Sequence, residues 1–240
     1  MKHRDGGIVG YNVQAAVDAE HHLIVAHEVV TDGIDRDQLA PMAEQAREAT
    51  GIDTLTVVAD RGDFKSEPIR HCDTAGITPI VPKPLTSNAG AEGRFDKRDF
   101  RYIACDDEYR CPAGERAIFR FSREEGGLVV RKYWSSVCPR CPLKAQCTTG
   151  DYRRIARWEH ERLLEAMQRR LDRKPAAMTL RRRTIEHVFG TLKHWMGSTH
   201  FLTRGLHHVG TEMSLYVLAY NLKRVMRILG IGPLLRALQT

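Results

Sequence analysis

The first part of the chain alternates between strand-like and helix-like patterns. Segments 11–17 and 23–30 are rich in β-forming residues, and the polar segment 18–22 between them indicates a turn, so together they predict a β-hairpin. Asp and Gly residues at 32–35 then break the pattern and cap a helix. Apolar side chains recur at helical spacing over 37–49, and Gly51 closes this predicted helix.

A second alternation follows. The short apolar run 55–59 is of the kind buried on both faces of a sheet, and it ends on Asp60. A helix over 66–75, stopped by Gly76, leads into another buried strand over 77–81. Two hairpin strands followed by strand–helix alternation predict an α/β fold, with a mixed sheet covered by helices.

The character of the chain changes twice after this point. A segment rich in Pro, Ser, Asn and Gly over 82–93 reads as a linker. The part that follows has short β-like runs at 101–104, 117–121 and 128–134, and it holds five of the six cysteines. Helices are expected at 153–171, 176–196 and 208–229. We therefore expect a first core part over 1–84, a small β-rich insertion over 85–150 and a helical second part over 151–240.

Composition and charge indicate which kinds of binding partner the chain could have. The chain has 240 residues, 42% of them hydrophobic, which is enough for a real core. The net charge of +7 suits a polyanion such as nucleic acid, and arginine is concentrated between residues 153 and 183. There is no apolar run of the ~20 residues that a bilayer requires, and no signal-peptide pattern at the start. We expect a cytoplasmic protein without a membrane partner.

Two carboxylates are candidates for chemistry. Asp60 follows a predicted buried strand, where a carboxylate is well placed to hold a metal, although Asp before Arg-Gly also commonly caps a turn. In the helix R-R-R-T-I-E-H-V-F-G-T-L-K, the residues Arg182, Glu186, Phe189 and Lys193 share one face. An ion-paired surface helix explains the charges alone, but a solvated face rarely includes Phe.

Together these segments resemble the DDE transposases of bacterial insertion sequences, in the group with a cysteine-containing insert before the glutamate block. The resemblance rests on V-A-D-R-G at Asp60, R-x3-E-x6-K at Arg182, Glu186 and Lys193, and four longer segments. The longer segments are GYNVQAAVD, LIVAHEVVTDGIDRDQL, RCPAGE…CPRCPLKAQC and FLTRG…EMSLYVLAYNLKRV.

The resemblance implies an RNase H-like fold in which three carboxylates bind two Mg²⁺ (or Mn²⁺) ions for DNA strand cleavage and transfer. Asp60 would be the second acid and Glu186 the third, while Arg182 and Lys193 would contact phosphates or orient the glutamate. The implied partners are transposon ends and target DNA, bound by a homodimer.

Two departures from the family pattern matter. The family's first aspartate lies on a strand before residue 11, where this chain has none of that strand, and Asp18 is not at the family's position. Asp63 stands where the family usually has an aromatic residue. We interpret the chain as an N-terminally truncated copy and expect that it does not transpose DNA alone. The alternative is a non-catalytic, zinc-stabilised DNA-binding or self-associating remnant; an unrelated α/β nuclease would lack this combination of motifs.

The cysteines form a second candidate site. Cys138 and Cys141 are a tight pair, Cys147 follows closely, and Cys111 or Cys105 would complete four thiolates for a structural Zn²⁺. Cys72, in a predicted helix, is expected in the core. His187 and His194 have no partner at metal-ligand spacing. We expect Trp158 and Trp195 to be packing residues.

Overall fold

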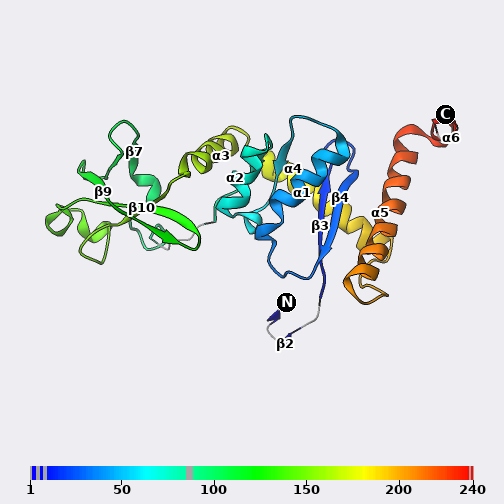
Figure 1. Ribbon diagram of the computed structural model, residues 1–240, viewed down its shortest axis with the longest axis horizontal. Helices are drawn as coiled ribbons and strands as arrows, with labels where there is room; N and C mark the ends of the chain where they lie inside the picture. Colours follow the sequence, from blue (N-terminus) through cyan, green and yellow to red (C-terminus); the bar gives the residue numbers. More distant parts are fainter. Residues whose placement is uncertain (1, 4–5, 8–9, 85–88, 238, 240) are drawn as a thin grey trace. The chain divides into compact units, whose positions relative to one another are not determined.

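The computed structural model describes residues 2–3, 6–7, 10–84, 89–237 and 239, and the fold is mixed α/β. The chain divides into two compact units (Figure 1). The first joins Met1–Lys83 to Leu163–Thr240, and the second is Pro84–Arg162. Within the described residues, no helix is both long and apolar enough to span a membrane.

The first unit begins with the predicted hairpin. Strands β3 (Asn12–Val17) and β4 (Ile24–Val30) pair antiparallel, after the short pair β1 (Lys2–His3) and β2 (Gly6–Gly7). Helix α1 (Leu39–Thr50) buries a face of small residues, with Met42 and Ala46 packed on Ala26 of β4. Gly51 ends α1 in the left-handed conformation at φ +64°, where glycine lacks the steric penalty of other residues.

Strand β5 (Thr56–Val58), helix α2 (Ser66–Thr74) and strand β6 (Thr78–Ile80) follow, and β5 pairs parallel with β6. The single mixed sheet that the sequence predicted is not seen, because the described residues form separate two-stranded pairs, β3–β4 and β5–β6. The prediction that β5 is buried on both faces was wrong. Thr56 is exposed and Val57 and Val58 are half-buried, so neither face of β5 is fully covered.

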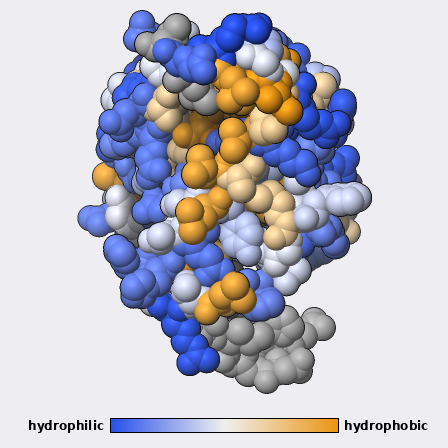
Figure 2. Space-filling model, turned by 90° about the vertical axis from the view of Figure 1, so that its right-hand side faces the viewer, coloured by the Kyte–Doolittle hydropathy of each residue, from blue (hydrophilic) through white to orange (hydrophobic). Residues whose placement is uncertain are grey.

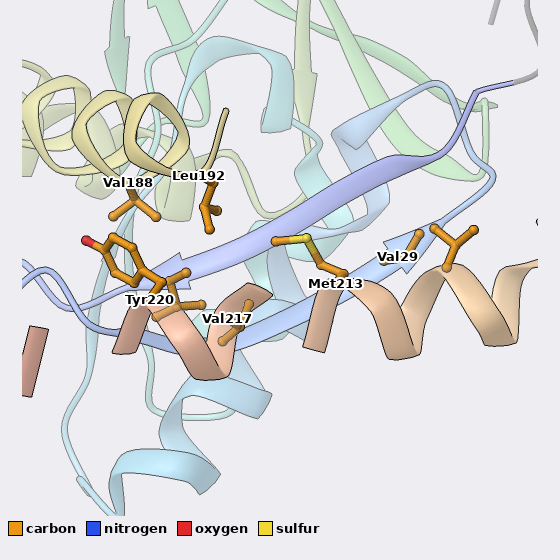
Figure 3. Packing of buried hydrophobic residues seen from close by; sticks show 8 residues of the cluster. Val29, Val188, Leu192, Met213, Val217 and Tyr220 are labelled. Atoms are coloured by element: carbon orange, nitrogen blue, oxygen red, sulfur yellow. The ribbon is translucent and has the colours of Figure 1, made fainter. Parts of the chain in front are cut away.

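The main core of this unit lies between the hairpin and two helices, α4 (Ala177–Gly190) and α5 (Leu206–Leu229). Figure 3 shows Val188 and Leu192 facing Tyr220, Val217 and Met213 of α5, with Val29 of β4 nearby. The turn that follows α4, η6 (Thr191–Trp195), is a π-helix, and α6 (Ile231–Ala237) follows α5.

One face of α5 and α6 is apolar and exposed. Figure 2 shows apolar side chains gathered on the side of the molecule where these helices lie. Four of the exposed leucines on α5, with the half-buried Val225 between the last two, recur at spacings of three and four residues: Leu215, Leu218, Leu222 and Leu229. This spacing is typical of a helix face that packs on another helix.

The second unit is a five-stranded antiparallel sheet in the order β11-β10-β9-β8-β7. The strands are β7 (Arg101–Ile103), β8 (Glu108–Arg110), β9 (Arg116–Glu125), β10 (Leu128–Trp134) and β11 (Ile155–Trp158). Its core is Phe100, Tyr109, Ala117, Tyr133 and Ile155.

The helix predicted over 153–171 was wrong at its beginning. Residues 155–158 form β11, which pairs with β10, and helix α3 spans only Glu161–Arg173. Strand formation here buries Ile155, Arg157 and Trp158 in the second unit, which therefore runs to Arg162.

Candidate functional site

Asp60 follows β5 and caps the one-turn 3-10 helix η2 (Arg61–Asp63). Its Oδ1 accepts a hydrogen bond from the Gly62 amide at 2.6 Å, and its own amide donates to Oδ2 of Asp63 at 3.0 Å. A Cβ on Gly62 would lie 2.9 Å from Oδ1 of Asp60, so any other residue there would displace the capping carboxylate. The turn-capping interpretation of Asp60 is therefore seen in the structure, and the carboxylate remains about half exposed at 46%.

A cation from α4 meets this carboxylate. Nη2 of Arg181 lies 2.8 Å from Oδ2 of Asp60. Arg181 lies on the same helix stripe as the buried residues Ala177, Thr184 and Val188, so α4 presents it towards the protein rather than to solvent. The sequence did not predict Arg181 as a site residue, because nothing in the run R-R-R indicates which arginine pairs with a carboxylate far away in the sequence.

Two further aspartates surround Asp60. Asp35 lies in the one-turn helix η1 (Asp35–Asp37), and its Oδ1 accepts hydrogen bonds from the side-chain amides of Asn12 (Nδ2, 2.5 Å) and Gln14 (Nε2, 2.7 Å). Burial, and then the charge of Asp60, raise the pKa of Asp63 to about 6; Asp35 adds to this rise, while Arg181 opposes it. The site at the end of β5 is thus three carboxylates with one guanidinium.

Glu186 is placed elsewhere on α4. It lies five residues after Arg181, which turns it about 140° around the helix axis, and its side chain is exposed. Glu186 lines an open groove with His187, Gly190, Thr191, His194 and Trp195, and Asp60 is not among the lining residues. Arg182 and Lys193 are exposed on the same side of the helix, whereas Phe189 packs partly against the core.

In the structure, Asp60 is paired with Arg181, and Glu186 lines a groove of which Asp60 is not a part. In the part of the chain that is described, no group of three or more His, Cys, Asp or Glu side chains is arranged to hold a metal ion. Asp18 accepts a hydrogen bond from the His21 amide at 2.5 Å, so it serves the hairpin turn.

The two tryptophans behave differently. Trp158 is 4% exposed, as a packing residue should be, but Trp195 is 84% exposed, so its predicted packing role was wrong. Trp195 ends the π-helix, and such local departures from α-helical winding are frequent at functional sites. The exposed indole therefore belongs to the groove beside Glu186.

The cysteines form no disulfide among the described residues. Cys72 is fully buried in α2 as predicted, and burial raises the pKa of its thiol to about 11. Cys111, Cys138, Cys141 and Cys147 all line one cavity of the second unit, whereas Cys105 is exposed and does not line it.

Replacing Asp63 with asparagine is expected to stabilise the chain at high pH. The folded chain keeps a proton on Asp63 up to about pH 6, whereas an unfolded aspartate loses it near pH 4 (about 3.9). The folded state thus binds more protons between these values, and stability falls as the pH rises through them. Asp63→Asn should raise the free energy of unfolding by about 1–3 kcal/mol at pH 8, at ~1.4 kcal/mol per pKa unit and discounted for partial exposure.

Urea unfolding in metal-free buffer at pH 4 and pH 8 measures this difference. Asp99→Asn is the matched control, because Asp96 and Asp99 form the same capping box around η3 (Lys97–Asp99) but Asp99 is exposed. Equal gains at both pH values, or the same gain in the control, would contradict the expected effect of buried charge.

Residues 110–226 match the family model described as transposase DDE domain. The matched segment is just under half of the chain, and it contains Glu186 and the four cavity cysteines but not Asp60. The match supports a DDE transposase, a class that depends on divalent metal in general and acts on DNA. No curated protein and no solved structure matches the chain.

Proposed function

We propose that this chain is a DDE transposase that acts in DNA transposition in the cytoplasm. The observation that carries the proposal is the family match over 110–226, together with the exposure of the R-x3-E-x6-K residues along α4 and the π-helix η6 that follows it. The order hairpin, α1, β5, α2, β6 and the later helix α4 is compatible with an RNase H-like core, with β7–β11 as its insertion. Strand cleavage and transfer are phosphoryl transfers that such a core performs.

DNA is the proposed partner of the exposed side of α4. Arg182 precedes Glu186 on α4 and Lys193 follows it on η6, and all three are exposed. Basic side chains on one face attract the phosphate backbone, and the net charge of +7 acts in the same direction. Trp195 offers an exposed aromatic ring beside them, the kind of surface on which an unpaired base stacks. We propose that transposon ends and target DNA bind along the groove that Glu186 and Trp195 line.

Asp60 and Glu186 are the proposed metal-binding acids for Mg²⁺ or Mn²⁺. As arranged, the described residues do not fit a two-metal centre, because Asp60 is paired with Arg181 and Glu186 lines a different groove. We therefore expect the isolated chain to be inactive in strand transfer, and we assign no catalytic step to its residues. A homodimer on DNA belongs to the same proposal and is supported by the apolar stripe of α5.

The poor fit of the described residues to a two-metal centre favours a second candidate function. A non-catalytic DNA-binding or self-associating module needs the basic side of α4 and the apolar side of α5, but no assembled metal centre. The Asp60–Arg181 ion pair is the specific observation that supports it, since a guanidinium occupies the place beside the carboxylate where a cation would bind.

The test is DNA binding and strand cleavage by the purified chain. For binding, Arg182→Gln with Lys193→Gln should lower the affinity for duplex DNA and reduce the slope of log affinity against log salt by about 2, at ~0.9 per phosphate contact. Lys223→Gln with Arg227→Gln removes the same charge from exposed positions of α5 and should leave the slope nearly unchanged. Equal losses in both double variants would contradict a DNA site on α4.

For cleavage, supercoiled plasmid and duplex oligonucleotides are incubated with the chain and Mg²⁺ or Mn²⁺. We expect no strand transfer, and strand transfer by the isolated chain would overturn the expected inactivity. Metal-dependent nicking that disappears in both Asp60→Asn and Glu186→Gln supports the two acids, whereas nicking that survives both rejects them. DNA binding without nicking selects the non-catalytic function.

A further inference from the structure

Three separate segments of the second unit bring four cysteines to one cavity. Cys111 follows β8, Cys138 and Cys141 begin and follow the one-turn helix η4 (Cys138–Arg140), and Cys147 follows η5 (Lys144–Gln146). The cavity has a volume of about 30 Å³, the size of one or two water-sized bodies. Most of the remaining wall is apolar, including Phe95, Phe100 and Leu143. Four sulfurs therefore share a small and largely apolar space.

The local backbone of these segments is built from tight turns. The Gly114 amide donates to the Cys111 carbonyl at 2.8 Å, and the Cys141 amide donates to the Cys138 carbonyl at 3.2 Å. Each turn begins with Cys-Pro, and Gly114 adopts φ +79°, which favours glycine. The spacing Cys-x2-Cys around such a turn is the usual way in which a short loop offers two thiolates to one metal ion.

A positively charged side chain lines the cavity together with the four cysteines. Arg153 lines the cavity and its guanidinium lies over the Phe100 ring at 5.5 Å. Its Nε is buried and has no hydrogen-bond partner among the residues that the structure describes. A buried N–H donor normally has an acceptor. Thiolate sulfurs in the same cavity would supply a negatively charged acceptor for Nε of Arg153, which neutral thiols do not.

We propose that Cys111, Cys138, Cys141 and Cys147 bind one structural zinc ion as four thiolates. Binding exchanges four thiol protons for one Zn²⁺ and leaves a centre of charge −2, which Arg153 and Lys144 at the cavity wall offset. The sulfurs do not stand in ligand geometry as described, so the ion must draw the two turns and Cys147 together. Among the residues that the structure describes, the main buried cluster of this unit is small, so a metal centre would add much to its stability.

This inference does not depend on the proposed function, because metal content is measured without DNA. The full chain is expressed with zinc, dialysed against metal-free buffer and analysed by mass spectrometry for zinc and iron. We expect one zinc per chain in the wild type and in Cys105→Ser, the matched control with an exposed cysteine outside the cavity. Cys138→Ser with Cys141→Ser should lose nearly all of it, and Cys111→Ser or Cys147→Ser should lose most.

Two further measurements keep the test decisive if the double variant folds poorly. In the wild type, a thiol reagent should titrate Cys105 at once and four more thiols only after a strong chelator is added. Cobalt in place of zinc should show the visible absorption of tetrahedral thiolate coordination. Absence of zinc, iron in its place, zinc retained in the cavity variants, or four thiols reactive without chelator would each overturn the zinc site.

Discussion

Replacing Asp107 with alanine is expected to lower the free energy of unfolding of the second unit by about 3–5 kcal/mol. Oδ1 of Asp107 accepts hydrogen bonds from the hydroxyls of Tyr102 and Tyr133, both at 2.7 Å, and Oδ2 accepts one from Arg131. Tyr133 is completely buried, so its hydroxyl would lose its partner without gaining water. Hydrogen bonds to a charged acceptor contribute about 1.5–3 kcal/mol each, and three on one carboxylate do not add fully.

The pH dependence of this contribution has a defined sign. Burial by itself raises the pKa of Asp107, but the hydrogen bonds from Tyr102 and Tyr133 and the charge of Arg131 outweigh it, so the pKa is lowered. The stabilisation is therefore present above the pKa of an unfolded aspartate, near pH 4 (about 3.9), and is lost as the pH falls through the lowered value.

Urea unfolding followed by hydrogen exchange of the β8–β10 amides measures the effect. Asp106→Ala is the control, since Asp106 is the exposed neighbour in the same turn and should change the stability by less than about 0.5 kcal/mol. Asp107→Gly separates the backbone from the side chain, because Asp107 has φ +49° and glycine relieves that conformation. A loss below about 1 kcal/mol in Asp107→Ala would contradict the role of the hydrogen-bond cluster.

Replacing Asn221 with aspartate is expected to lower the free energy of unfolding of the first unit by about 2–4 kcal/mol. Oδ1 of Asn221 accepts from the Ile24 amide at 3.0 Å, and Nδ2 donates to the Ile24 carbonyl at 2.8 Å. The side chain thus binds β4 as a neighbouring strand would, and it attaches α5 to the hairpin. Aspartate keeps the acceptor, loses the donor and sets a negative charge against the Ile24 carbonyl.

Thermal and urea unfolding of Asn221→Asp and Asn221→Ala test this attachment. Alanine removes both hydrogen bonds without adding charge, so it should cost less than aspartate at neutral pH. Thr211→Asp adds the same charge at an exposed position of α5 and should have little effect. If the aspartate variant is no less stable than the alanine variant, the amide donor to Ile24 is not important.

Much of the scaffold follows from periodicity alone. The hairpin of β3 and β4, the helices α1, α2 and α5, and strand β6 were all predicted close to their observed bounds, because each has a local signal in the sequence: β-forming runs around a polar turn, apolar residues at helical spacing, or a short apolar run. Strand β11 was missed because it contains Arg157, which a sequence pattern counts as exposed. Its guanidinium is buried because it lies 3.6 Å from the Tyr102 ring, a contact between residues distant in the sequence.

For the candidate sites too, one part could be predicted from the sequence and another depends on the tertiary structure. The sequence by itself determined which residues carry chemical groups: Asp60 after a strand, Glu186 with Arg182 and Lys193 on one helix face, and the closely spaced cysteines. Only the tertiary structure decided their neighbours. It pairs Asp60 with Arg181, 121 residues away, leaves Glu186 in an exposed groove and selects Cys111 over Cys105 at the cavity. The physical reason is that local periodicity specifies which face of an element is buried, whereas contacts between elements depend on long-range packing that no local pattern records.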